Sequence, residues 1–267
     1  MNKQIFCILQ KDFKEYKSTR TNLVFGITLL GLCTMVMGAT YLLPSLVDKL
    51  ITAAADMVSD VNTITDTLTA FFPGNLKANM GILASDIIIF YGVVVILFTH
   101  NLISKEIKEG KWISPISVGY KPFNLILSKG LIFGLGAAIP CIGFYNLYFF
   151  VGNVYLVPDY KLIDAISNSL IMGFSIFSIV YITIILASIY KQAITSAITM
   201  IPLIAVAPDI FTLFSFGKYF PTYMLTHLYQ SSSNISNIII PAIFTLVIAM
   251  VLTVVAAKKS SIIEITR

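Results

Sequence analysis

Two glutamates in a basic run come closest to a catalytic pattern in this chain. Glu106 and Glu109 lie one helical turn apart in Ile103–Gly110, and two carboxyl groups so placed could act as a general acid and a general base. Lysines alternate with these glutamates, at Lys105, Lys108 and Lys111. Opposite charges at this spacing are more typical of a solvated helix surface whose side chains pair with one another. We therefore predict a solvated helix here rather than an acid–base pair.

Histidine and cysteine are too sparse and too scattered to form a metal site. His100 and His227 are the only histidines, and the predicted membrane topology below puts them near opposite faces. The three cysteines, Cys7, Cys33 and Cys141, have no Cys-X-X-Cys spacing. Neither a zinc site nor a disulfide framework is predicted from such a pattern.

Nucleotide-binding and acyl-transfer motifs are also missing from the sequence. Gly110-Lys111 and Gly217-Lys218 both lack the upstream glycine of a phosphate-binding loop. Gly173-Phe174-Ser175 lacks the second glycine of a nucleophile elbow. We therefore predict no catalytic residues, no bound cofactor and no metal, and we do not expect the chain to be an enzyme.

The composition instead indicates a membrane protein. Hydrophobic residues make up 57% of the 267 residues and charged residues only 12%, whereas a soluble domain has about 25% charged residues. Six apolar runs reach the length of about 20 residues that a membrane-spanning helix needs. They are Asn22–Leu43, Ile82–Ser104, Phe123–Phe149, Ile163–Tyr190, Ala193–Phe214 and Ile238–Ala257. The predicted fold is an all-α polytopic membrane protein, a single transmembrane domain over 1–267, with Pro202 and Pro208 interrupting the fifth helix.

Basic residues predict the orientation of these helices. Of the 18 lysines and arginines, all but Lys49, Lys77, Lys161 and Lys218 fall on one side of the predicted membrane, together with both termini. Because basic residues concentrate on the cytoplasmic side, we predict a multi-pass protein of the cell membrane with cytoplasmic termini. The net charge of +5 is then explained by attraction to anionic membrane lipid, and no nucleic acid partner is predicted.

The first residues, 1–21, form a basic leader. Ile5, Leu9, Phe13 and Tyr16 recur at spacings of three and four, and lysines occupy the remaining positions. This period predicts an amphipathic helix that lies in the cytoplasmic interface with its aromatic side chains among the lipid headgroups. The alternative is a disordered basic tail.

Two segments are predicted on the outer side. The first, residues 44–85, contains apolar residues at alternating spacings of four and three: Leu46, Leu50, Ala54, Met57, Val61, Ile64, Leu68 and Phe71. This seam predicts a helix that packs against a partner or lies flat on the outer leaflet. The second, residues 208–236, is apolar and aromatic but broken by Gly217 and Pro221, which predicts a re-entrant or surface-lying element. Asp209 within it is a candidate residue of a substrate path.

One membrane helix carries a row of small residues. Gly130, Gly134 and Ala138 recur every four residues in the third predicted helix. Small side chains at this spacing let two helix backbones approach closely, which indicates a helix contact along this row. The alternative is that these glycines reflect only the general frequency of glycine in membrane helices.

The polar element between the second and third helices, residues 104–122, resembles a known family. Its Glu106, Gly110, Pro115 and Ser117, followed by Lys129 at the entrance to the next helix, are similar to the first cytoplasmic loop of ABC-2-type transporter permeases. Two positions depart from the family pattern, since Lys111 stands where threonine is common and Ser128 where glycine precedes the lysine.

The resemblance implies a function as the membrane subunit of an ATP-driven exporter. In such permeases this loop is a coupling helix that docks on a separate ATPase subunit, and Trp112 and Ile113 between basic residues would suit such an interface. The alternative for Trp112 is an anchor at the lipid interface. The resemblance further implies a dimer with a second copy or a related permease, and two ATPase subunits. A hydrophobic or amphipathic substrate, such as a peptide, an antimicrobial compound or a lipid-like molecule, would fit an apolar path.

Two other functions remain open on the sequence alone. A secondary carrier or channel would work without an ATPase and would need an ionisable residue in its path, for which Asp209 is the candidate. An immunity or sensor protein of the membrane would bind a ligand without transporting it.

Overall fold

The computed structural model describes residues 2–53, 75–190, 199–201 and 236–265. Over these residues the chain is helical, with no β-strand beyond a single bridge between Asn75 and Val157. The helices are α1 (Asn2–Ser18), α2 (Thr21–Ala53), α4 (Leu76–Asp86), the π-helix η1 (Ile87–Tyr91), α5 (Gly92–Lys108), α6 (Ile113–Ser117), α7 (Pro122–Tyr155), α8 (Leu162–Tyr190) and α12 (Ser236–Ile265). The predicted all-α fold is confirmed for the described part of the chain.

Five stretches of these helices are long and apolar enough to cross a membrane. They are Thr21–Leu42, Leu76–Lys108, Pro122–Tyr155, Leu162–Tyr190 and Ile239–Lys259. Each corresponds to one of the helices predicted from hydropathy, so a multi-pass membrane protein is supported. The predicted helix Ala193–Phe214 lies outside the described residues except for 199–201. The outer element 208–236 lies outside them except for its last residue, and Asp209 is not described.

The second membrane helix is longer than predicted because α4, η1 and α5 join without a break. It begins at Leu76 rather than at Ile82 and ends at Lys108. The π-helix in its middle has i→i+5 hydrogen bonds, one residue wider than those of an α-helix. Here the hydroxyl of Tyr91 donates to the carbonyl of Ala137 on α7 at 2.9 Å. This joins the second membrane helix to the third.

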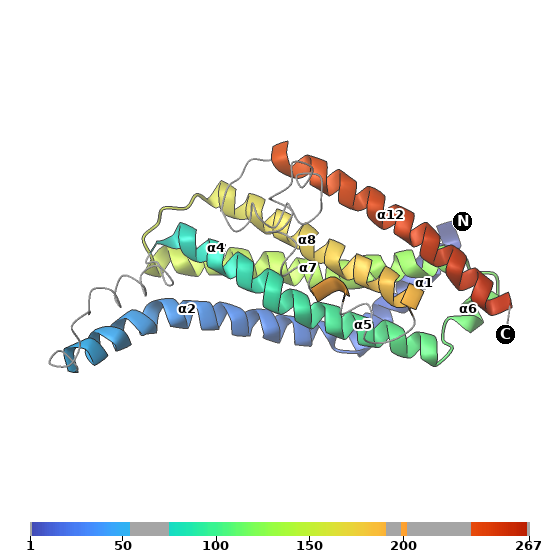
Figure 1. Cartoon of the computed structure of the whole chain (residues 1–267), viewed down its shortest axis with the longest axis horizontal. Coiled ribbons are helices and arrows are strands. Elements are labelled where there is room, and N and C mark those ends of the chain that lie inside the picture. The colour runs from blue at the N-terminus through green and yellow to red at the C-terminus, as the bar shows by residue number, and fades with distance from the viewer. Residues whose placement is uncertain (1, 54–74, 191–198, 202–235, 266–267) are drawn as a thin grey trace.

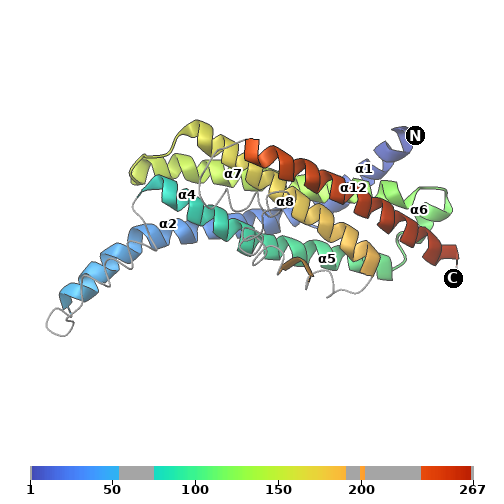
Figure 2. The same cartoon turned by 45° about the horizontal axis from the view of Figure 1, so that its top comes forward.

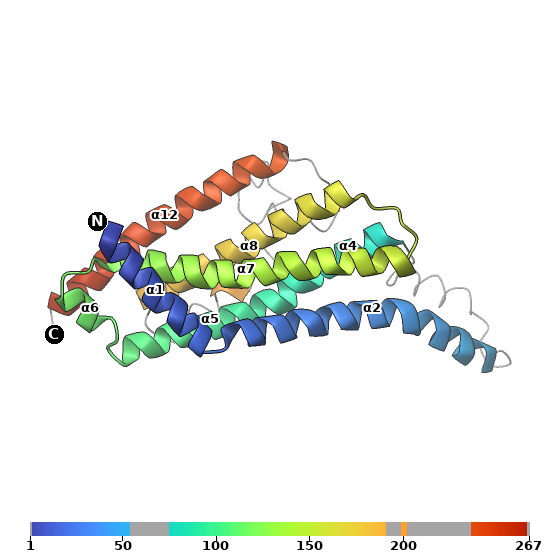
Figure 3. The same ribbon diagram turned by 180° about the vertical axis from the view of Figure 1, so that it is seen from behind.

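The outer segment 44–85 divides into three parts. Its first residues continue α2, which runs past Pro44 to Ala53, and its last residues belong to α4. The part between them, 54–74, lies outside the described residues, so the predicted apolar seam is not tested there. The end of α2 extends beyond the ends of the neighbouring helices, as Figures 1 and 3 show.

Glycines hold α7 close to α8. A Cβ added to Gly134 would lie 2.7 Å from the Phe177 ring, and one added to Gly130 would overlap the Tyr181 ring. The two rings stack, with centroids 6.0 Å apart. The close helix approach predicted from the row of small residues is thus confirmed, and the partner helix is α8.

The helices form an elongated bundle whose two ends differ in composition. The start of α1, the end of α12 and the short helix α6 lie at the same end, in all three views (Figures 1–3). The last turn of α5 carries Lys105 and Lys108, and the segment that leads through α6 to α7 carries Lys111 and Lys121. We call the end of the bundle where α5 ends and α6 lies the basic end. Helix α8 leads toward the basic end, and α12 runs beside it in the same direction.

The leader is a helix, as predicted, but a different face of it is buried. Ile8, Asp12 and Tyr16 face the protein, whereas Phe13 is 57% exposed. The Tyr16 ring meets Phe133 edge-on at 5.3 Å between centroids and lies against Gly136. Helix α1 is therefore packed on α7 and not only placed at a membrane surface.

Candidate functional site

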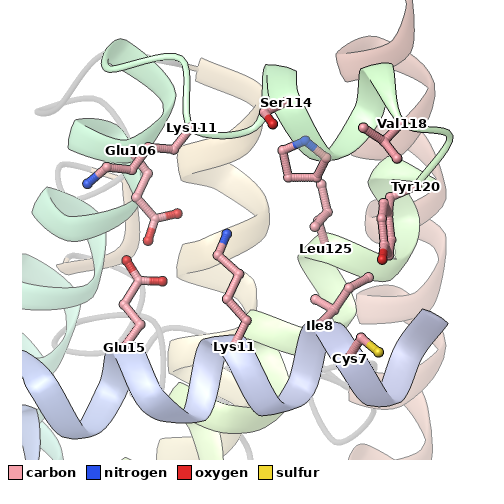
Figure 4. Close-up of a pocket in the computed structure, with 11 residues that line it drawn as sticks. Cys7, Ile8, Lys11, Glu15, Glu106, Lys111, Ser114, Val118, Tyr120 and Leu125 are labelled. Carbon is pink, nitrogen blue, oxygen red and sulfur yellow. The ribbon is translucent and has the colours of Figure 1, made fainter. Parts of the chain in front are cut away.

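Helices α1, α5, α6 and α7 meet around a pocket at the basic end. The pocket has a volume of about 650 Å³ and is lined by Cys7, Ile8, Lys11, Glu15, Glu106, Lys111, Ser114, Pro115, Val118, Tyr120 and Leu125. Figure 4 shows that the carboxyl groups of two lining residues, Glu15 on α1 and Glu106 on α5, point toward each other. The pocket thus opens onto a group of buried charges.

One ammonium group holds three carboxyl groups there. The Nζ atom of Lys129 lies 2.7 Å from Glu106 Oε1, 3.1 Å from Glu15 Oε2 and 3.4 Å from Asp12 Oδ1. Lys129, Asp12 and Glu106 are each at most 4% exposed. A buried charge is costly unless it is paired and hydrogen-bonded. Here each of the four groups has an oppositely charged partner and at least one hydrogen bond. We call Asp12, Glu15, Glu106 and Lys129 the charge cluster.

Two neutral side chains complete the hydrogen bonding of the charge cluster. Ser128 Oγ donates to Asp12 Oδ2 at 2.6 Å, and Trp112 Nε1 donates to Glu106 Oε2 at 2.9 Å. Glu106 therefore joins Trp112, just before α6, to Lys129 on α7. Because Lys129 also binds two carboxyl groups of α1, the charge cluster links three helices, α1, α5 and α7, and Trp112 joins the start of α6 to them.

A glycine turn directs the chain from α5 into α6. Gly110 has a φ of +69°, a conformation that glycine adopts without the strain of a side chain. The amide of Gly110 donates to Ile107 O and the amide of Lys111 donates to Glu106 O, the pair of bonds that ends many α-helices. This turn carries Trp112 back over the end of α5, where its indole reaches Glu106.

The sequence-predicted interface residues fall into two groups in the structure. Glu106 and Trp112 are buried and bonded to each other, so the prediction of a solvated Glu106 is wrong. Gly110 makes the turn, and Pro115 lines the pocket. Ile113 and Ser117 are exposed on α6, and Val118 at its end is 74% exposed. The outward surface of this element therefore consists of residues other than Trp112.

Glu109 lies on the solvated surface of the helix, as predicted. Glu109 pairs with Lys111 at 2.8 Å on the solvent side, and this hydrogen bond lowers the pKa of the Glu109 carboxyl.

Glu15 is only partly buried. Burial alone would raise the pKa of Glu15, but the neighbouring Lys129 ammonium and the hydrogen bonds to the carboxyl outweigh burial and lower the pKa.

Asp12 and Glu15 were missed from the sequence. The leader was interpreted from its apolar residues and lysines, and its two acidic residues lie on the face turned toward α7. A signal was present, because Lys129 stands within a membrane-spanning helix and a buried lysine needs a carboxylate partner. The acidic residues of the leader are the partners that this requirement points to.

Asp86 is a third acidic residue that was not predicted from the sequence. It lies at the junction of α4 and η1, half-buried within a membrane-spanning helix. No hydrogen-bond donor or basic group among the described residues is paired with its carboxyl group. Exposed side chains of the same helix, Phe90 and Leu97, follow it at helical spacing, so Asp86 belongs to a face that the described helices leave open.

The site has no arrangement suited to catalysis within the described part of the chain. No group of three or more histidine, cysteine, aspartate or glutamate side chains there is arranged to hold a metal ion. The charge cluster contains no nucleophile beside a base. Its contacts join α1, α5 and α7, and the Trp112 indole connects the start of α6 to Glu106.

Comparison with known proteins adds no assignment. No protein-family model matches the chain, and no curated protein has a matching sequence.

Proposed function

We propose that the chain is the membrane subunit of an ATP-driven exporter of the ABC-2 permease type, with ATP hydrolysis performed by a separate subunit. The observation that carries the proposal is the attachment of α6 to the membrane helices through the charge cluster. A short helix fixed in this way at the basic end is suited to receive a push from a soluble partner. The motif around Glu106, Gly110 and Lys129 supports the same assignment.

The charge cluster provides a path for movement. Displacing α6 pulls on Trp112, whose indole is bonded to Glu106, and Glu106 is bonded to Lys129. Separating these groups inside the protein would leave charges without partners, at a cost of about 3–5 kcal/mol. The helices therefore move together rather than apart, so a displacement of α6 is passed to α7 and to α1.

The surface offered to the ATPase consists of exposed residues of the loop. Ile113 is 50% exposed and Val118 is 74% exposed, and Lys111 lies beside them. Protein–protein interfaces commonly have an apolar core surrounded by a polar rim. In this proposal Trp112 positions the element from inside, while Ile113 and Val118 contact the partner.

A topology of six membrane helices with both termini in the cytoplasm fits the direction of the helices. Helices α8 and α12 run the same way, although they are consecutive among the described membrane helices. A further crossing between them is needed, and residues 191–235 are where we propose it, with the re-entrant element on the outer side. The basic end would be cytoplasmic under the positive-inside rule.

The proposed exporter works as a dimer on an apolar or amphipathic substrate. Leu23, Ile27, Leu30 and Met35 of α2 are each more than half exposed, so this helix offers an apolar face to lipid or to a second permease. A path between two such subunits would suit a peptide, an antimicrobial compound or a lipid-like molecule.

A secondary carrier is the second candidate function, and Asp86 favours it. An ionisable residue inside the membrane often marks the path of an ion or a substrate. A carrier would function without an ATPase, and its activity would depend on Asp86.

Purification from native membranes in mild detergent tests the main proposal. We expect a soluble protein with a Gly-X-X-X-X-Gly-Lys-Ser/Thr loop to co-purify in a fixed ratio, and Ile113→Arg to reduce its recovery. Val157→Arg, at the other end of the bundle and 63% exposed, is the matched control and should leave recovery unchanged. A cross-linked preparation without any such ATPase would reject the exporter and favour the carrier.

A further inference from the structure

A second cavity lies between the membrane helices α7, α8 and α12. Its volume is about 380 Å³, within the range of cavities that hold ligands. Its lining is Phe123, Leu127, Leu131, Phe177, Ser178, Tyr181, Thr245, Leu246, Val247, Ala249, Met250 and Thr253. All of these residues belong to membrane-spanning stretches, so the cavity lies within the membrane part of the protein.

The hydroxyl groups in this cavity already use their hydrogens. Ser178, Thr245 and Thr253 each donate to a carbonyl of their own helix, at 2.6–2.8 Å. Because the Thr253 hydrogen is used in this way, the Tyr181 hydroxyl is the donor in its 3.1 Å bond to Thr253. No lining hydroxyl therefore has a hydrogen left to donate to a polar ligand, and the cavity is suited to hydrocarbon.

The cavity is open toward the outside of the bundle. Leu246 and Met250 line it and are 52% and 66% exposed, so its rim on α12 reaches the outer surface of the described helices. In a membrane this surface borders the lipid chains. None of the described helices would have to move for a lipid chain to enter from the bilayer.

Exposed basic residues lie at one end of the cavity. Helices α7 and α12 run in opposite directions, so the start of α7 and the end of α12 share the basic end (Figures 1 and 3). Lys121 precedes the lining residue Phe123 by two positions, and Lys259 follows Thr253 by six positions, about 9 Å along a helix. Both lysines are exposed. Basic residues beside a gap between membrane helices are suited to anionic lipid headgroups.

We propose that this cavity binds an acyl chain of an anionic phospholipid, whose phosphate lies near Lys121 and Lys259. The apolar lining accounts for the chain, and the two lysines account for the charge of the headgroup. The site does not involve the charge cluster or α6. Lipid binding in this cavity is therefore independent of the partner that binds α6.

The test measures lipid bound to the purified full-length chain. After reconstitution with equal amounts of phosphatidylglycerol and phosphatidylcholine and re-extraction, mass spectrometry should find phosphatidylglycerol enriched on the protein. Ala249→Phe fills the cavity and should reduce retained phosphatidylglycerol about tenfold, because the buried chain supplies most of the binding. Val251→Phe is the matched control, since it adds the same ring on the exposed side of α12, and it should retain the lipid.

Separate variants test the headgroup and guard against misfolding. The double variant Lys121→Gln and Lys259→Gln should lose the preference for phosphatidylglycerol while still retaining lipid. Leu246→Trp closes the exposed rim and replaces Ala249→Phe if that variant aggregates. Equal retention by the cavity-filling variant and Val251→Phe would overturn the proposal. The proposal would also be overturned if the unmodified chain showed no preference for phosphatidylglycerol over phosphatidylcholine. The same holds if inorganic phosphate alone raised the unfolding temperature of the chain as much as phosphatidylglycerol does.

Discussion

Lys129 and Glu106 are separated by 23 positions in the chain, yet the ammonium of one lies 2.7 Å from the carboxyl group of the other. The contact joins the start of one membrane helix to the end of the preceding one, directly beneath α6. Glu15 and Asp12 approach the same ammonium from α1, so a single lysine compensates carboxyl groups from two helices. The charge cluster is thus organised around Lys129, and removing the Lys129 ammonium would take the cation away from all three carboxyl groups.

Replacing Lys129 by methionine should destabilise the protein strongly. The variant keeps the length of the side chain but leaves buried carboxyl groups without a cation, a change that costs about 3–5 kcal/mol. We expect a lower thermal unfolding temperature in detergent and a red shift in the emission of Trp112, the only tryptophan of the chain. Lys105→Met, at an exposed position of α5, should change neither. Equal unfolding temperatures for the two variants would contradict the structural role of Lys129.

Trp112 and Glu106 should be energetically coupled. Trp112→Phe removes the indole donor but keeps an aromatic ring, and Glu106→Gln removes the charge but keeps the shape. Because the two side chains are in contact, the double variant should lose less stability than the sum of the single variants, by about 0.5–3 kcal/mol. Thermal unfolding followed by circular dichroism gives the stabilities of the unmodified chain, the two single variants and the double variant. Additive effects would mean that the Glu106 carboxyl strengthens the 2.9 Å hydrogen bond from Trp112 no more than a neutral amide oxygen does.

The membrane helices could be predicted from the sequence, but the charge cluster could not. A span such as Leu162–Tyr190 is recognised from its composition alone, because the bilayer requires a long apolar run. The bond from Ser128 to Asp12 connects positions 116 residues apart, and no local periodicity contains that information. The direction of the Trp112 indole depends on the turn at Gly110, and spacing alone does not distinguish an inward ring from an exposed one.

Acid should loosen α1 through Glu15. The pKa of Glu15 in the folded protein lies below its ordinary value of 4.5, so its contribution to stability is present above about pH 4.5 and is lost as the pH falls through the lowered value. The groups that face this carboxyl are Lys129, Glu106 and, on α1 itself, Lys11. We expect the emission of Trp112 to shift to the red in this acidic range. Glu15→Gln should make the shift smaller, whereas Glu109→Gln, in an exposed pair with Lys111, should leave it unchanged. Identical titrations of Glu15→Gln and the unmodified chain would exclude Glu15 as the responsible group.

Replacing Asp86 by leucine should stabilise the protein. A carboxylate within a membrane-spanning helix costs up to about 2.5–3.5 kcal/mol at the centre of the bilayer, and no described residue offsets this for Asp86. Asp159→Leu is the opposite case, because Asp159 accepts from the Asn75 side chain at 3.0 Å and from the Lys77 amide at 2.7 Å. In lipid nanodiscs, the unfolding temperature should therefore rise for Asp86→Leu and fall for Asp159→Leu. A fall for both would mean that Asp86 has a stabilising partner in the folded chain. A rise for Asp86→Leu together with lost transport would identify a residue retained for function at the expense of stability.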